Sequence, residues 1–144
     1  MRKEIIEQWL RIDAIRKKSK DKERAKSLIN SAEINMKIVE TIIPTEESAI
    51  LLFRETYESI HQLGDAKWWL EGYEPRNHEV SMEILKELNI KEKTKLNHLN
   101  RFKSLRNDIN YRGFKPSLTQ AKEILEFWKQ CSEEIIFLLK KELE

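Results

Sequence analysis

Apolar residues recur every three or four positions along most of this chain, which is the spacing that gives an α-helix one apolar face. The pattern predicts a first helix over residues 2–18 and five more helices, which begin near residues 22, 45, 77, 92 and 117. Prolines, glycines and residues that cap helix ends separate these segments. Short connections favour antiparallel neighbours. We therefore predict an all-α fold, an antiparallel up-and-down bundle of about five helices.

The chain is long enough for one domain with a substantial core. It has 144 residues and a mass of 17.3 kDa, and only three glycines and three prolines, which leaves little material for β-turns. We expect residues 1–20 to form an N-terminal helical extension of a core bundle over residues 21–144. Ser19 and Asp21 offer capping side chains for a break between the first two helices, but no glycine or proline separates them, so their continuity is left open.

Local signals predict where several helices end. Pro44 should end the second helix at residue 43, and residues 45–48 resemble an acidic N-terminal cap for the third. Gly64 should interrupt that helix, for close packing of another helix. Trp68 and Trp69 cannot both face one core, because adjacent helical residues point about 100° apart. We expect at least one of them at an interface or beneath the following loop.

Composition excludes several classes of function. The net charge is only +2, so a nucleic-acid site must be a local patch. A lone cysteine, Cys131, fits a reducing cytoplasm, and no apolar run approaches the ~20 residues of a membrane span. His61 and His98 have no obvious partner at metal-ligand spacing, and recognisable cofactor motifs are missing. We expect no metal, no cofactor and no membrane association.

An arginine interrupts the apolar stripe of the helix that begins near residue 92. Arg106 lies near the middle of that stripe, whose members are Leu96, Leu99, Phe102, Leu105 and Ile109. A charge that faces a core or an interface costs several kcal/mol unless it finds acceptors. Arg106 should therefore have a partner carboxylate, a partner subunit or an anionic ligand.

The run Arg-Asn-Asp-x-x-Tyr-Arg-Gly, residues 106–113, resembles the signature of the HEPN family of small helical domains. That signature is an arginine, a polar residue, a few further positions and a histidine, on the fourth helix of a bundle. Arg106 and Asn107 match it, whereas Tyr111 stands where the family has histidine. The resemblance extends over the chain after residue 20, through residues 24–33, residues 72–78 and the last long helix.

The resemblance implies a site that binds RNA or a nucleotide. In the family, arginine and histidine from two subunits face each other across a dimer and cleave RNA through the ribose 2′-hydroxyl, without a metal. It also implies a homodimer and a nucleotidyltransferase partner in a toxin–antitoxin system. The catalytic candidates are Arg106, Asn107 and Tyr111. The candidates for RNA or nucleotide binding are Arg106, Asp108, Arg112, Lys103, Lys115 and His78.

The departure at Tyr111 predicts feeble catalysis. A tyrosine is a poor base at neutral pH, because its ordinary pKa is near 10. Residues 106 and 111 also lie about 140° apart on an ideal helix, so they converge only across a dimer or where the helix frays. Asp108 and Arg112, four residues apart, should form a surface pair. His78, in the first turn of the helix capped by Asn77, is either a structural hydrogen-bonding group or a catalyst.

Three functions remain open at this stage. The first, which we favour, is a HEPN-like module that binds RNA or a nucleotide with weak or no catalysis. The second is a metal-independent HEPN endoribonuclease toxin, so whether the chain is an enzyme is undecided. The third is a dimeric interaction scaffold in which Arg106 belongs to a purely structural network.

Overall fold

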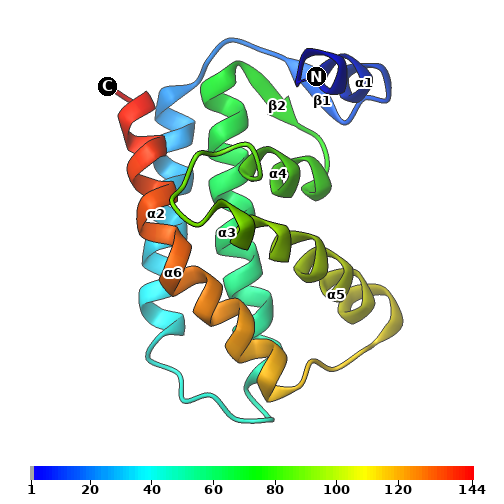
Figure 1. The fold of residues 1–144 in the computed structure, drawn as a ribbon, viewed down its shortest axis with the longest axis vertical. Helices are drawn as coiled ribbons and strands as arrows, with labels where there is room; N and C mark the ends of the chain where they lie inside the picture. The colour runs from blue at the N-terminus through cyan, green and yellow to red at the C-terminus, as the bar shows by residue number, and fades with distance from the viewer. Residues whose placement is uncertain (1) are drawn as a thin grey trace.

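The computed structural model describes residues 2–144 and is helical apart from one small antiparallel sheet (Figure 1). Met1, part of the predicted extension, lies outside the described residues. The α-helices are α1 (Arg2–Arg11), α2 (Lys22–Val39), α3 (Ala49–Glu71), α4 (His78–Leu85), α5 (His98–Arg112) and α6 (Leu118–Glu142). The remaining elements are a 3₁₀-helix, η1 (Lys93–Asn97), and the strands β1 (Ile15–Lys17) and β2 (Tyr73–Pro75). The predicted all-α fold class is confirmed.

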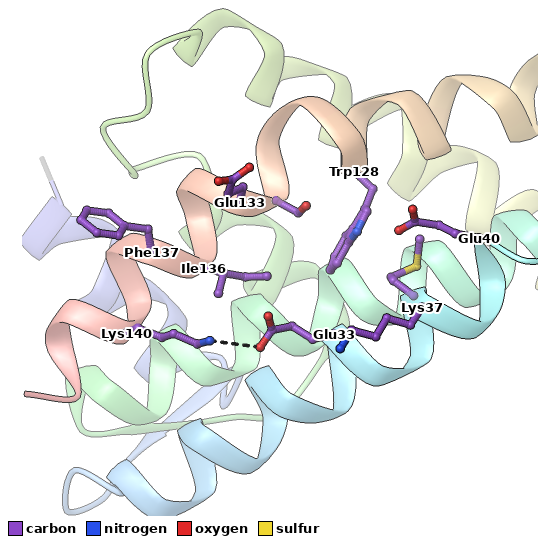
Figure 2. Close-up of a pocket in the computed structure, with 10 residues that line it drawn as sticks. Glu33, Lys37, Glu40, Trp128, Glu133, Ile136, Phe137 and Lys140 are labelled. Carbon is purple, nitrogen blue, oxygen red and sulfur yellow. Dashed lines mark ion pairs between the residues drawn. The ribbon is translucent and has the colours of Figure 1, made fainter.

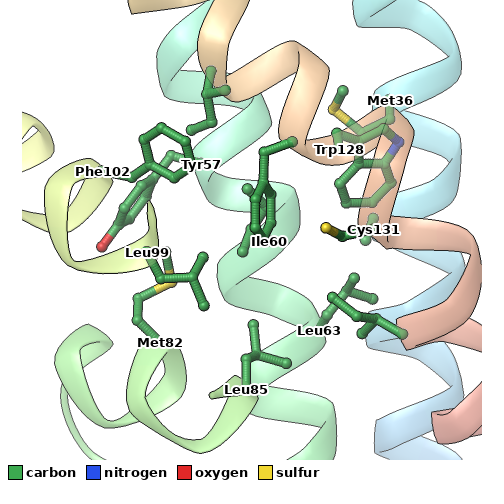
Figure 3. Close-up of a cluster of buried hydrophobic side chains, with 14 of the residues drawn as sticks. Met36, Tyr57, Ile60, Leu63, Met82, Leu85, Leu99, Phe102, Trp128 and Cys131 are labelled. Carbon is green, nitrogen blue, oxygen red and sulfur yellow. The ribbon is translucent and has the colours of Figure 1, made fainter. Parts of the chain in front are cut away.

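Helix α3 is the centre of the bundle. It packs against α2 and α6 on one side and against α4 and α5 on another (Figure 1). The core between these helices includes Ile60 and Leu63 of α3, Leu99 of α5 and Cys131 of α6 (Figure 3). Because the apolar faces of all five helices meet here, this core fixes how the start of α4 and the middle of α5 sit on α3.

The predicted interruption at Gly64 is wrong, because α3 runs through it without a break. Gly64 lies directly beneath α4, and a Cβ atom built on it would come within 2.0 Å of the Ser81 carbonyl oxygen. The glycine therefore does not end the helix. It allows the backbone of α4 to approach α3 closely, which confirms the expected close helix packing at this glycine.

The two adjacent tryptophans do not share one core, as predicted, but both are buried, in two separate clusters. Trp69 belongs to the main core, and Trp68 to a second cluster that also contains Ala14, Ile15, Val80 and Ile84. The Trp68 indole N–H donates to the Val80 carbonyl oxygen at 2.8 Å, and its ring meets the Trp9 ring edge-on at 5.5 Å. Trp68 is therefore buried beneath the N-terminal segment.

The predicted helix over residues 2–18 is wrong beyond Arg11. The chain turns at Asp13, which has a φ of 60°, and then forms β1, which pairs antiparallel with β2 in the register Ile15 to Pro75. Ala14 and Ile15 become buried in the cluster around Trp68. This long-range packing outweighs the local helical pattern, and it makes α1 and α2 separate helices.

Other helix ends follow the capping chemistry more closely. Asp21 caps α2 by accepting from the Arg24 N–H at 2.9 Å, and Ser117 caps α6 in a reciprocal pair with Gln120. Gly113 ends α5 with a φ of 68°, a conformation that favours glycine. Three boundaries differ from the prediction. Helix α2 ends at residue 39, before Pro44, and α5 begins at residue 98, after the 3₁₀-helix. Helix α3 begins at Ala49 rather than near residue 45, so Glu46 and Glu47 precede it, and Ser48 forms no side-chain capping hydrogen bond.

Candidate functional site

Arg106 and His78 meet where α5 crosses the start of α4. Asn77 caps α4 by accepting from the Val80 N–H at 3.0 Å, and this places His78 in the first turn of the helix. Arg106 Nη1 lies 2.7 Å from His78 Nε2. Both side chains are half-buried. The structure therefore brings together two of the candidates that the sequence selected.

The direction of this hydrogen bond fixes the state of the histidine. An arginine can only donate, so His78 Nε2 accepts, and the neutral ring carries its hydrogen on Nδ1. Nδ1 faces the Tyr57 hydroxyl oxygen at 3.4 Å, and the Arg106 guanidinium lies over the Tyr57 ring at 5.9 Å. Burial raises the pKa of Tyr57, so its hydroxyl stays protonated. The pair thus consists of a cation and a neutral imidazole on an aromatic support.

The partner of Arg106 is not the carboxylate that an arginine in an apolar stripe usually requires. Among residues 2–144, Arg106 forms no ion pair with an aspartate or glutamate, and its side-chain hydrogen bond goes to the neutral His78. A hydrogen bond to a neutral acceptor leaves the guanidinium without an ion-pair partner; Glu58 is near enough for the charge of Arg106 to act on it, but the two form no ion pair. The charge remains available to an anion.

A second group of polar residues adjoins the pair and was missed by the sequence analysis. The His61 ring on α3 lies 6.3 Å from the His78 ring. Its Nε2 is 3.6 Å from Asp65, and its Nδ1 is 3.8 Å from Glu58, too long for a hydrogen bond. Asp65 accepts a hydrogen bond from Ser81 of α4.

The statement that His61 lacks partners at a suitable spacing is therefore wrong. Glu58 precedes it by three residues and Asp65 follows it by four, which places all three on one face of α3. This spacing was the signal that could have identified the group. The part of the chain that the structure describes contains no set of three or more His, Cys, Asp or Glu residues arranged to hold a metal ion.

The pKa values of the two histidines are shifted in opposite directions. Burial lowers the pKa of His78, and the charges of Arg106 and His61 lower it further. Burial also disfavours a charged His61, but Glu58 and Asp65 outweigh it and raise the pKa of that ring. Burial raises the pKa of Asp65. The site therefore holds a neutral imidazole next to one that protonates more readily.

We expect NMR titration of the imidazole rings to give a pKa below about 6.5 for His78 and above it for His61. The contribution of neutral His78 to stability is present above about pH 6.5 and is lost as the pH falls through its lowered pKa. The contribution of charged His61 to stability is present below about pH 6.5 and is lost as the pH rises through its raised pKa. Arg106→Ala should raise the pKa of His78, and Glu58→Gln should lower that of His61. Equal pKa values for the two rings would contradict this arrangement.

The other candidates from the sequence fall into two groups. Lys103 lies on α5 one turn before Arg106 and contacts Glu83 at 3.5 Å, and its charge acts on His78. Asn107 follows Arg106 on α5, and its buried side-chain oxygen has no hydrogen-bond partner among the described residues. The second group, at the C-terminal end of α5 and beyond, is exposed and consists of Tyr111, Arg112 and Lys115.

The surface pair predicted between Asp108 and Arg112 is confirmed, at 3.9 Å. The Arg112 side chain is 82% exposed, so the pair contributes little to stability. Tyr111 is 75% exposed and is no part of the contact between Arg106 and His78. In the structure, the side chain beside Arg106 is therefore His78 and not Tyr111.

A groove between α2 and α6 is the main alternative site (Figure 2). It encloses about 420 Å³ above Trp128 and Ile136, and Glu33 and Lys140 form an ion pair of 3.3 Å across it. Its lining includes none of the residues selected from the sequence and no histidine. Five of the ten lining residues are charged, but the groove contains no arginine and lies apart from the Arg106–His78 pair.

Comparisons with known proteins do not show which of these two sites is functional. A scan against protein-family models, a search of curated proteins and a search of solved structures each found no match. The resemblance to HEPN proteins therefore depends on the residues quoted above. No helix among residues 2–144 combines the length and the apolar character that crossing a bilayer requires.

Proposed function

We propose that this chain is a HEPN-like module that binds RNA or a nucleotide through Arg106, with weak or no catalysis. The observation that carries the proposal is the half-buried Arg106, whose guanidinium has the neutral His78 as its hydrogen-bond partner and forms no ion pair with a carboxylate of residues 2–144. Retaining such a charge within an apolar stripe is costly without a ligand. A phosphate group supplies the missing negative charge.

A phosphodiester suits the geometry of the site. The planar guanidinium donates two parallel hydrogen bonds to phosphate oxygens. Lys103, one turn away on α5, adds a second positive charge. The net charge of the whole chain is only +2, so this local patch, rather than a global field, would attract the polyanion.

We expect a labelled single-stranded RNA to bind the protein with an affinity that falls as salt rises, because neutralised phosphates release counterions. Arg106→Ala should weaken binding by about 10- to 100-fold, which corresponds to the loss of a hydrogen bond to a charged group. Fluorescence anisotropy at several salt concentrations measures both effects. Thermal unfolding of the same samples shows whether the fold is intact.

The matched control is Arg101→Ala. It removes the same charge from the same helix, but Arg101 is exposed and paired with Glu123 at 2.7 Å. We expect its effect on RNA binding to be several-fold smaller than that of Arg106→Ala. Equal losses in the two variants, or a loss that follows unfolding alone, would favour the scaffold hypothesis, in which Arg106 is only structural.

The state of His78 supports a second candidate function, a metal-independent endoribonuclease. A phosphate that draws Arg106 away would free Nε2 to accept the proton of a ribose 2′-hydroxyl. The 2′-oxygen would then attack phosphorus, and the 5′-oxygen would leave with a proton, giving a 2′,3′-cyclic phosphate. A positioned base contributes about 10²- to 10⁴-fold. His78 would thus take the role that the exposed Tyr111 cannot fill.

The same labelled RNA, incubated with excess chelator, separates the two candidates. Cleavage that resists chelation and is lost in His78→Ala favours the ribonuclease. Binding without cleavage favours the module. Tyr111→Phe serves as the control, because an exposed tyrosine away from the pair should not affect either outcome.

The partners implied by the resemblance remain predictions. These are a homodimer and a nucleotidyltransferase partner in a toxin–antitoxin system. Arg106 and His78 meet within one chain, so their contact does not require a second subunit. The exposed Arg112 and Lys115 would be free to meet a partner or the rest of an RNA strand. We place this role in the cytoplasm, which the free and buried Cys131 favours.

A further inference from the structure

A hollow of about 360 Å³ lies between α1, the first turns of α4 and the middle of α5. This volume is within the range of small-molecule sites. Apolar and polar groups share its wall. The members that carry chemistry are Trp9 from α1, Asn77, Glu79 and Glu83 from α4 and its cap, and Lys103 from α5.

The hollow adjoins the Arg106–His78 pair. Asn77 and Glu79, both in its wall, are the immediate neighbours of His78 in the chain. Lys103 precedes Arg106 by three residues, a spacing that brings side chains on a helix within about 5–6 Å at Cβ. A ligand whose phosphate lies on Arg106 can therefore place its next group in the hollow. In a nucleotide, the ribose alone separates the phosphate from the base.

The polar groups of the wall present a donor beside an acceptor. Lys103 Nζ lies 3.5 Å from Glu83 Oε1, which also binds Lys86 at 2.9 Å. Among residues 2–144, the hydrogen bonds of this carboxylate involve Oε1, so Oε2 is available to a ligand. A carboxylate oxygen has two lone pairs, so Oε2 can accept from two neighbouring donors.

Guanine matches this arrangement better than the other bases do. Its Watson–Crick edge presents the O6 acceptor next to two donors, N1–H and the N2 amino group. Lysine donates to O6, and the carboxylate accepts from both donors. Adenine, cytosine and uracil also offer an acceptor to the lysine, but each presents only one donor group on this edge to the carboxylate, so each forms one hydrogen bond fewer than guanine.

Trp9 supplies an aromatic surface for the base. Its indole is half-buried, and an edge contact with Trp68 at 5.5 Å holds it in place. Stacking of a base on an aromatic ring contributes about 1–3 kcal/mol in nucleic-acid-binding proteins. The hollow therefore combines a stacking wall with a polar edge.

We propose that this hollow binds a guanine base of the RNA or nucleotide whose phosphate lies on Arg106. The inference rests on the proposed function, because Arg106 supplies the neighbouring phosphate site. It goes further in naming the base and the residues that select it: Glu83 and Lys103 read the edge, and Trp9 stacks on the face.

The test is calorimetric titration with the 5′-monophosphates of guanosine, adenosine, cytidine and uridine, and with ribose 5-phosphate. Guanosine monophosphate should bind about 10- to 100-fold more tightly than the other nucleotides, the effect of one bidentate contact. Glu83→Gln should remove that preference and leave ribose 5-phosphate binding unchanged. Trp9→Leu should weaken all four nucleotides but not ribose 5-phosphate.

Two controls keep the outcome clear. Glu87→Gln removes a nearby carboxylate that binds Arg2 at 2.9 Å and does not line the hollow, so the preference should remain. Quenching of tryptophan fluorescence by guanosine monophosphate, but not by ribose 5-phosphate, tests the role of Trp9 without a substitution. Lys103→Met tests the polar edge independently of Glu83 and should also reduce the preference.

The failure of this inference is distinguishable from the failure of the proposed function. If ribose 5-phosphate and RNA bind through Arg106 but guanosine monophosphate binds no more tightly than the others, the guanine site is wrong and the phosphate site stands. If the preference survives Glu83→Gln, the hollow is not what selects the base. If neither RNA nor any phosphate binds, both proposals are wrong.

Discussion

Gly64→Ala is expected to reduce the free energy of unfolding by about 3 kcal/mol, the upper end of the usual cost of overpacking. An added Cβ would lie 2.0 Å from the Ser81 carbonyl oxygen and 2.6 Å from its carbonyl carbon. These atoms belong to the backbone of α4, so a side-chain rotation cannot relieve the clash. The intrinsic preference of a helix for alanine, about 1 kcal/mol, is too small to compensate. Chemical denaturation measures the difference.

The same substitution should also weaken RNA binding under conditions where the variant remains folded. Displacing α4 moves Ser81 and, three residues earlier, His78, which contacts Arg106. Gly113→Ala is the control, because Gly113 also has a special conformation, with φ of 68°, but nothing lies within 4 Å of an added Cβ. Its cost should be only about 1–2 kcal/mol, from the left-handed backbone alone. A Gly64→Ala variant as stable as the parent would show that α4 does not pack this closely on α3.

Trp68→Ala is expected to cost about 3–5 kcal/mol, as for other large aromatic residues removed from a core. Trp68 is 1% exposed, and its indole contacts the Trp9 and Tyr73 rings at 5.5 and 5.7 Å. Its N–H donates to the Val80 carbonyl oxygen. The substitution therefore removes the side chain on which the N-terminal segment is packed. Denaturation gives the total cost, and limited proteolysis reports the release of residues 2–20.

Trp68→Phe separates packing from hydrogen bonding. It keeps most of the apolar contact with Trp9 but loses the indole donor, so we expect a smaller cost and less proteolysis of the N-terminal segment. If residues 2–20 remained as protected in Trp68→Ala as in the parent, α1 and β1 would not depend on this cluster. That result would contradict the packing described here.

The helices whose structure depends on local chemistry were predictable from the sequence. The periodic apolar faces predicted α2, α3, α5 and α6. Single residues predicted where several helices, including α4, begin or end. Asn77 and Ser117 accept hydrogen bonds from N–H groups a few residues along the chain, and Gly113 takes the left-handed conformation that ends α5. Each of these signals acts within one turn, so it can be read without knowing the fold.

The failures share a different cause. Residues 12–18 have apolar residues at helical spacing, yet Ile15 lies in a strand, because it packs with Trp68 and pairs with Pro75 far along the chain. Gly64 was predicted to interrupt a helix for close packing; the packing is present, but the helix continues and the Ser81 backbone fills the space. Contacts between distant segments decided both positions, and the local pattern does not show which segments meet there.

The candidate site was predictable in part for the same reason. The position of Arg106 in an apolar stripe showed that it needs a partner, but the partner, His78, lies 28 residues away in sequence and could be chosen only after α4 and α5 were placed. The group around His61 could have been identified from the sequence, although it was missed. Glu58 and Asp65 stand at the spacings that put carboxylates beside a helical histidine.

The pairing of β1 with β2 also has a consequence for the order in which the chain folds. Packing of α2 on α3 brings the two strands together, since Lys18 N–H donates to Gly72 at 2.9 Å and Asp21 N–H to Trp69 at 3.2 Å. Little further loop-closure entropy is then needed to form the strand pair. We therefore expect the segment before α2 to dock late and to open before the rest of the bundle unfolds. Such opening would widen the hollow beside Trp9 and give a ligand a route to the site.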